Sequence, residues 1–109
     1  MTTLQQIPND LFLEIAQKVA LKRGYDPSKL RLCNDNIHKL EYNHNDKWVK
    51  FGALSYNDFI NYLYNNYLGI LTFDEAVTKM KNYRKRAKSV MEKSDNPYSP
   101  SSLSYNILW

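Results

Sequence analysis

Apolar residues recur at four-residue spacing near the start of the chain and predict a helix over residues 9–23. Two adjacent series form the apolar stripe: Leu11, Ile15 and Val19, and Phe12, Ala16 and Ala20. Pro8 suits a helix start, and Asn9 or Asp10 can cap the first turn. Gly24 is placed to end the helix in the left-handed conformation.

Three short segments that follow have the composition of β-strands. Residues 30–33 and 37–42 are separated by a polar stretch, and residues 47–51 follow the polar loop 43–46. The second and third segments carry aromatic or β-branched residues on either side of that loop, which indicates a β-hairpin. A hairpin or three-stranded antiparallel sheet of this size is not stable alone, so we expect it to pack on the helices.

Two capping patterns predict two further helices. Residues 55–58 (SYND) resemble a capping box with Asp in place of Glu, and they open a helix that ends near Tyr67. Thr72 and Glu75 form a second capping box, which opens a helix of roughly 20 residues ending at position 92 or 93. The apolar positions of that helix predict its buried stripe: Phe73, Ala76, Val77, Met80, Tyr83, Ala87, Val90 and Met91.

The chain ends with a Pro- and Ser-rich connection, residues 94–102, and an apolar segment. We expect a short terminal helix capped by Ser101 or Ser102. Its apolar residues are expected to dock on the body, since a free tail is usually polar. They are Leu103, Ile107, Leu108 and Trp109. The predicted fold is therefore α+β in a single small basic domain, residues 1–109: an N-terminal helix, a small antiparallel sheet, two further helices and a docked C-terminal tail.

Composition narrows the class of protein. The chain is 43% apolar, which argues against wholesale disorder, and no apolar run is long enough to span a bilayer. The start of the chain has neither the basic nor the apolar region of a secretory signal. Cys33 is the single cysteine, which excludes an internal disulfide and favours a reducing compartment.

Positive charge is concentrated on the third predicted helix. Seven bases and one acid lie between residues 79 and 93, whereas the whole chain has a net charge of +4. Lys81, Arg84, Lys85 and Lys88 follow one another at spacings of three and four, and therefore share one face of a helix. Like charges at that spacing repel, so helix propensity does not explain them. The face indicates phosphate contact, or alternatively an ordinary solvated surface in a lysine-rich chain.

Other candidate features are weaker. The tyrosine-rich segment 56–67 offers stacking platforms for unpaired bases, but tyrosines at helical spacing more often pack in a core. We expect Trp48 and Trp109 to be core residues, with interface anchors as the alternative. His38 and His44 lack metal-ligand spacing, and His44 is expected to be exposed in its loop. We expect Cys33 to be half-buried.

No sequence pattern supports catalysis. There is no phosphate-binding glycine loop, nucleophile elbow or HExxH motif. We therefore expect no enzyme activity, no metal and no cofactor. An alternative role for Arg86 is structural, through an ion pair with Asp58 or Asp95.

Three segments together resemble a family of short basic proteins of nucleocytoplasmic large DNA viruses, the giant-virus type. They are FGALSYNDF (51–59), MKNYRKRA (80–87) and YSPSSLSYNILW (98–109). The pattern of the resemblance comprises Phe51, Gly52, Ala53, Tyr56, Asp58, Phe59, Tyr83, Arg86, Ala87, Tyr98, Ser99, Pro100, Leu103, Ile107, Leu108 and Trp109. Upstream segments extend it to residues 24–109. The resemblance implies a setting, the virion or the viral factory in the host cytoplasm, and no activity.

The function predicted is that of a non-enzymatic viral protein that binds the phosphate backbone of nucleic acid, with DNA favoured, without sequence specificity. Its expected contact residues are Lys79, Lys81, Arg84, Lys85, Arg86 and Lys88. The alternative is a virion-structural or protein-interaction module. In that case the basic helix meets an acidic viral protein, exposed aromatic residues anchor the contact, and homo-oligomers belong to the same class.

Overall fold

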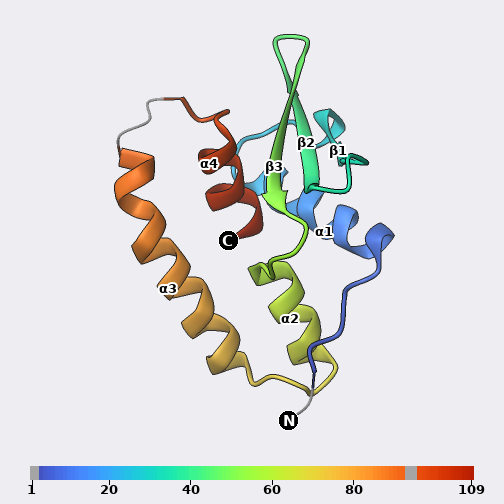
Figure 1. Cartoon of the computed structure of the whole chain (residues 1–109), viewed down its shortest axis with the longest axis vertical. Helices are drawn as coiled ribbons and strands as arrows, with labels where there is room; N and C mark the ends of the chain where they lie inside the picture. The colour runs from blue at the N-terminus through green and yellow to red at the C-terminus, as the bar shows by residue number, and fades with distance from the viewer. Residues whose placement is uncertain (1–2, 93–95) are drawn as a thin grey trace.

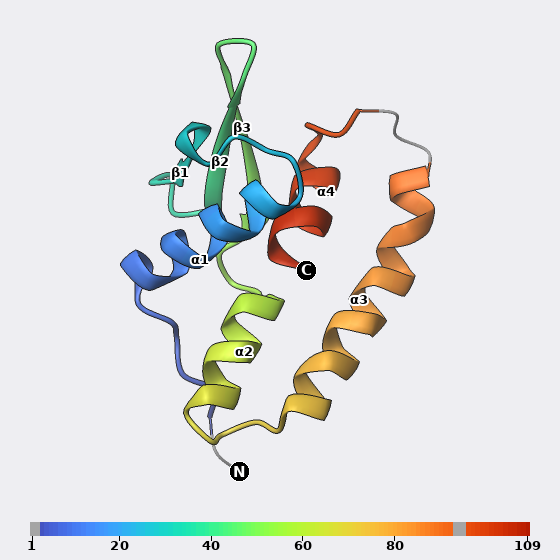
Figure 2. The same ribbon diagram turned by 180° about the vertical axis from the view of Figure 1, so that it is seen from behind.

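A computed structural model describes residues 3–92 and 96–109 as an α+β fold. Its elements in chain order are α1 (Asn9–Lys22), η1 (Pro27–Lys29), β1 (Leu30–Leu32), β2 (His38–His44), β3 (Lys47–Ala53), α2 (Phe59–Tyr67), α3 (Phe73–Glu92), α4 (Pro100–Leu103) and η2 (Ser104–Leu108). The segment η2 is a π-helical turn that continues α4. In both Figure 1 and Figure 2, α3 runs along one side of the molecule, and the C-terminal segment lies between α3 and the sheet. The fold class and the order of elements predicted from the sequence are confirmed.

The sheet is antiparallel, with strand order β1-β2-β3. The hairpin between β2 and β3 turns on two residues, Asn45 and Asp46, whose φ angles are 52° and 64°. Positive φ at both positions gives a turn whose twist matches that of the strands. The predicted loop 43–46 was too long, because Asn43 and His44 pair with β3.

One face of the sheet forms the centre of the core. Its buried side chains alternate along the strands, as Leu30, Leu40, Tyr42 and Phe51. Ala16 and Ala20 of α1 are fully buried in the same cluster. The stripe predicted for this helix therefore faces the core in part, although Leu11 is exposed.

The C-terminal segment completes this core. Leu103, Ile107 and Leu108 are buried in the cluster, as predicted. The Tyr25 hydroxyl donates to the Pro97 carbonyl at 2.7 Å and accepts from the Asn106 amide at 3.1 Å, which holds the segment against the body. No helix of the described chain is long and apolar enough to cross a membrane.

Three predicted helix caps are wrong. Neither Asn9 nor Asp10 caps α1, which begins after Pro8 without a side-chain cap. Helix α2 begins three residues later than expected: its cap is Asp58, whose carboxylate accepts from the Asn61 amide at 2.9 Å. Helix α4 is capped by Ser99, which accepts from the Ser102 amide, because Pro100 occupies the first helical position. The capping box of α3 is confirmed by reciprocal hydrogen bonds between Thr72 and Glu75.

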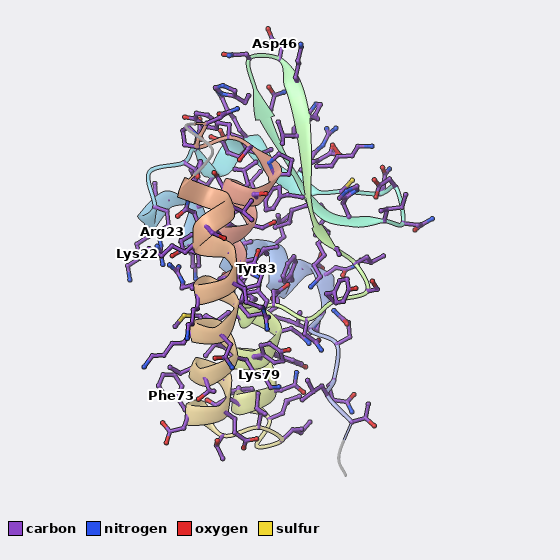
Figure 3. All side chains as sticks on the ribbon, turned by 60° about the vertical axis from the view of Figure 1, so that its left-hand side comes forward. Lys22, Arg23, Asp46, Phe73, Lys79 and Tyr83 are labelled. Atoms are coloured by element: carbon purple, nitrogen blue, oxygen red, sulfur yellow. The ribbon has the colours of Figure 1, made fainter. Side chains whose placement is uncertain are left out.

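Several predicted burial states are also wrong. Phe73 and Val90 are more than half exposed, since α3 packs on the body along its middle turns and Phe73 points away from α2 (Figure 3). Trp48 is 37% exposed, because its partner in the register is Asn43 on the face of the sheet opposite the core. His44 is half-buried and stacks on Tyr98 at 3.7 Å between ring centroids.

Two other expectations, on Cys33 and Trp109, are confirmed, and the remaining ones concern parts of the chain that the structure does not describe. Cys33 is half-buried, as expected. Trp109 is partly buried and packs against the core cluster. The predicted helix end at Lys93 and the start of the connection, Ser94 and Asp95, lie outside the described residues, and so does the Met91 side chain.

Gly52 gives a test of how the C-terminal segment docks. Its φ is +79°, and a Cβ atom there would lie 2.7 Å from Leu108 Cδ1. Gly69 has the same φ but no atom within 4 Å of the same position. Gly69→Ala should therefore lower the free energy of unfolding by backbone strain alone, about 1–2 kcal/mol. Gly52→Ala should lower it by about 1 kcal/mol more, because Leu108 must move. The measurement is urea unfolding of both variants. Equal losses in their free energy of unfolding would contradict this docking of Leu108.

Candidate functional site

A cavity of about 590 Å³ opens between the end of β3, helix α2, helix α3 and the C-terminal segment. Its walls include Tyr56, Tyr62, Tyr83, Arg86 and Trp109, and Lys39 and Asp58 also line it. Volumes of this size are typical of sites for small organic ligands. The cavity draws on four separate parts of the chain.

A buried ion pair belongs to the lining of this cavity. Lys39 Nζ donates to Asp58 Oδ2 at 2.6 Å, and the two side chains are 7% and 2% exposed. Asp58 Oδ1 simultaneously caps α2. Because Asp58 is engaged by Lys39, the predicted Arg86–Asp58 ion pair does not form; the alternative partner, Asp95, lies outside the described residues.

Aromatic side chains form the apolar part of the walls. The rings of Tyr83 and Trp109 stack, with centroids 4.2 Å apart and planes 11° from parallel. Tyr62 packs beside Trp109 at 5.9 Å. Tyr56 is 74% exposed, so its ring is available to a ligand at the cavity.

The electrostatics of the cavity act on the two inner tyrosines. Burial raises the pKa of Tyr83 above its usual value, and the Arg86 guanidinium opposes that rise. Burial is also the largest cause of the raised pKa of Tyr62; the Asp58 carboxylate adds to it, and Arg86 again opposes it. Both hydroxyls therefore stay protonated at neutral pH and remain hydrogen-bond donors.

The structure divides the six predicted contact bases among different sides of α3. Lys81, Lys85 and Lys88 are exposed and share the outer side of the helix, as expected for residues three, four and seven positions apart. Lys79 and Arg86 lie on the side that faces α2. There Lys79 Nζ is 5.3 Å from the Tyr62 ring centroid, and Figure 3 shows Lys79 and Tyr83 on this side.

Arg84 is separated from the outer lysines that the sequence grouped with it. It is half-buried, and its Nε donates to the Trp109 main-chain oxygen at 3.1 Å. A second guanidinium nitrogen reaches the Tyr105 carbonyl at 3.5 Å, and the group lies 4.4 Å over the Tyr105 ring. Arg84 therefore joins α3 to the C-terminal segment.

The histidines and acids form no metal site among residues 3–92 and 96–109, where no three His, Cys, Asp or Glu side chains gather to hold an ion. His38 instead contacts Asp35, with Nδ1 2.7 Å from Oδ2. Two main-chain amides and the His38 ring together hold the pKa of Asp35 well below its usual range.

Sequence reasoning missed Lys39 and its pairing with Asp58, which was considered only as a helix cap and as a partner of Arg86. A lysine in a lysine-rich chain carries no signal of burial, and the two residues lie 19 positions apart. The available signal was the position of Lys39 inside a strand that is otherwise largely buried, at residues 40–42.

No protein-family model, curated protein or solved structure matches this chain.

The buried ion pair predicts strong coupling between its two partners. Asp58→Asn keeps a helix-capping side chain but leaves Lys39 unpaired, and Lys39→Met leaves the carboxylate unpaired. Each should lower the free energy of unfolding by about 3–5 kcal/mol. The double variant should lose much less than the sum, because neither charge is then stranded. Additivity within about 0.5 kcal/mol in urea unfolding would contradict the pairing.

The orientation of Arg86 predicts a change in tyrosine titration. Arg86→Gln should raise the pKa of Tyr62 and of Tyr83, since it removes the positive charge that favours their phenolates. Lys85→Gln removes a neighbouring charge from the outer side and should leave both values nearly unchanged. The measurement is an NMR pH titration of ring-labelled tyrosine. Equal responses to the two substitutions would show that Arg86 does not face the cavity.

Proposed function

We propose that this protein is a non-enzymatic nucleic-acid-associated protein that binds the phosphate backbone through the outer side of α3. The observation that carries the proposal is the exposed set Lys81, Lys85 and Lys88 on a helix whose acids are confined to its two ends. Phosphate contacts by lysine ammonium groups are electrostatic and largely independent of sequence.

The biological setting is a further part of the proposal. The resemblance of residues 24–109 to proteins of large DNA viruses favours DNA as the polyanion, and the virion or the viral factory in the host cytoplasm as the location. The roles of the other bases also follow. Arg84 supports the helix from the C-terminal segment, and Lys79 and Arg86 extend the positive surface toward the cavity.

A second candidate function is protein interaction, favoured by one surface feature. Tyr67, Leu68 and Phe73 are exposed at the corner between α2 and α3, away from the cavity. Together they offer an apolar anchor beside the basic helix, suited to an acidic viral protein or a second copy of this chain. Loss of self-association or of partner capture in Tyr67→Ala/Phe73→Ala, with DNA binding intact, would support this candidate.

The outer lysines predict the salt dependence of binding. For the unmodified chain, log affinity for duplex DNA should fall linearly with log salt concentration. The variant Lys81→Gln/Lys85→Gln should reduce that slope by about 1.8, which is two phosphate contacts at 0.9 each. Fluorescence anisotropy with a labelled duplex over a salt series measures both slopes.

The matched control is Lys18→Gln/Lys22→Gln. These exposed lysines of α1 have the same four-residue spacing, and the control changes net charge equally. It should leave the slope nearly unchanged. Absence of binding at low salt would overturn the proposal. Equal reductions of the slope in the two double variants would show that binding depends only on net charge and not on the outer side of α3.

A further inference from the structure

The cavity beside α3 combines flat aromatic surfaces with an uncommitted cation. Tyr62, Tyr83 and Trp109 line it, and the largely exposed Tyr56 ring is also part of its wall. Arg86 lines the same space and makes no ion pair or hydrogen bond within the described part of the chain. Its side chain is exposed to solvent, and the buried charges of Lys39 and Asp58 cancel because the two side chains are paired. Arg86 therefore leaves the cavity with a net positive charge.

This chemistry discriminates among possible ligands. An acyl chain is disfavoured, because it would remove water from the Arg86 guanidinium without replacing its hydrogen bonds. A planar heteroaromatic ring stacks on tyrosine or tryptophan, and its edge carries both donors and acceptors. A phosphate group fits the fork of donors on a guanidinium. A nucleotide has both a planar heteroaromatic ring and a phosphate group.

We propose that the cavity binds one unpaired nucleotide, with its base beside Tyr56 and the inner aromatic residues and its phosphate on Arg86. This site rests on the proposed function and adds to it a preference for single-stranded nucleic acid. Lys79 lies two turns before Arg86 on the same side of α3, about 10 Å along the axis, and can hold a neighbouring phosphate of the same strand.

The consequence is a preference for single-stranded nucleic acid. A base in a duplex must leave its stack and its pair before it can enter a cavity. This step has a free-energy cost that is absent for an unpaired base in a single strand. A duplex therefore contacts the outer lysines alone, whereas a single strand contacts both the lysines and the cavity. At equal salt, the full chain should bind a single strand more tightly than a duplex of the same length.

The test compares two pairs of matched variants on single-stranded and duplex oligonucleotides. Tyr56→Ala is paired with Tyr67→Ala, which changes another largely exposed tyrosine, at the α2–α3 corner. Arg86→Gln is paired with Lys85→Gln, the adjacent residue on the outer side. Tyr56→Ala and Arg86→Gln should each weaken single-strand binding about fivefold or more and duplex binding less than twofold. Tyr67→Ala should change neither, and Lys85→Gln should weaken both alike.

A second arm separates this proposal from the proposed function. A nucleoside monophosphate is titrated into the isotope-labelled full chain while amide NMR signals are followed, with inorganic phosphate and the free nucleoside as comparisons. Shifts at residues 52–58 that need both base and phosphate support the cavity as a nucleotide site, even where no polynucleotide binds. Duplex and single strand bound equally, with no effect specific to Arg86→Gln or Tyr56→Ala, would overturn the cavity site and leave the proposed function standing. No response to any of these ligands would overturn both.

Discussion

The buried pair of Lys39 and Asp58 is the contact on which the arrangement around the cavity depends. An ionised side chain at 2% exposure is stable only when its charge and its hydrogen bonds are satisfied. Asp58 meets this condition by accepting from Lys39 with one oxygen and from the Asn61 amide with the other. The same carboxylate therefore joins strand β2 to the start of α2, and it sets where that helix begins.

The polar network continues along α2 to the N-terminal segment. Asn61 accepts from the Ile7 amide at 2.9 Å, and Asn65 exchanges two hydrogen bonds with the main chain of Gln5. Both asparagines are almost fully buried, and no buried side-chain polar atom of the described residues lacks a partner. A completely satisfied network of this kind orders its members strongly, because any slip strands a polar group. It gives one wall of the cavity a defined shape.

The sequence predicts the elements that arise from local signals and misses those that depend on distant contacts. The period of α1, the capping box of Thr72 and Glu75, and the hairpin after His44 each depend on neighbouring residues, and all three are present. The start of α2 was misplaced because residues 55–58 satisfy a local capping pattern. The true cap is selected by Lys39, a residue far away in the chain. Trp48 was misplaced for a similar reason, since strand register decides which face a residue occupies.

The candidate site shows the same division between local and distant information. The charge of α3 was visible in the sequence, but its separation into three sides was not, because a helical wheel does not reveal what packs against each side. Arg84 donates to the main chain of the C-terminal segment, and Trp109 of that segment stacks on Tyr83. Arg86 lies next to the cavity. Repulsion among the outer lysines opposes folding of α3, and an anion that binds only the folded chain offsets that repulsion. Under the proposed function, repulsion among the outer lysines lowers the stability of the free protein and is relieved when they contact the phosphate backbone. The packing of its opposite side on α2 and the C-terminal segment holds the helix in place until then.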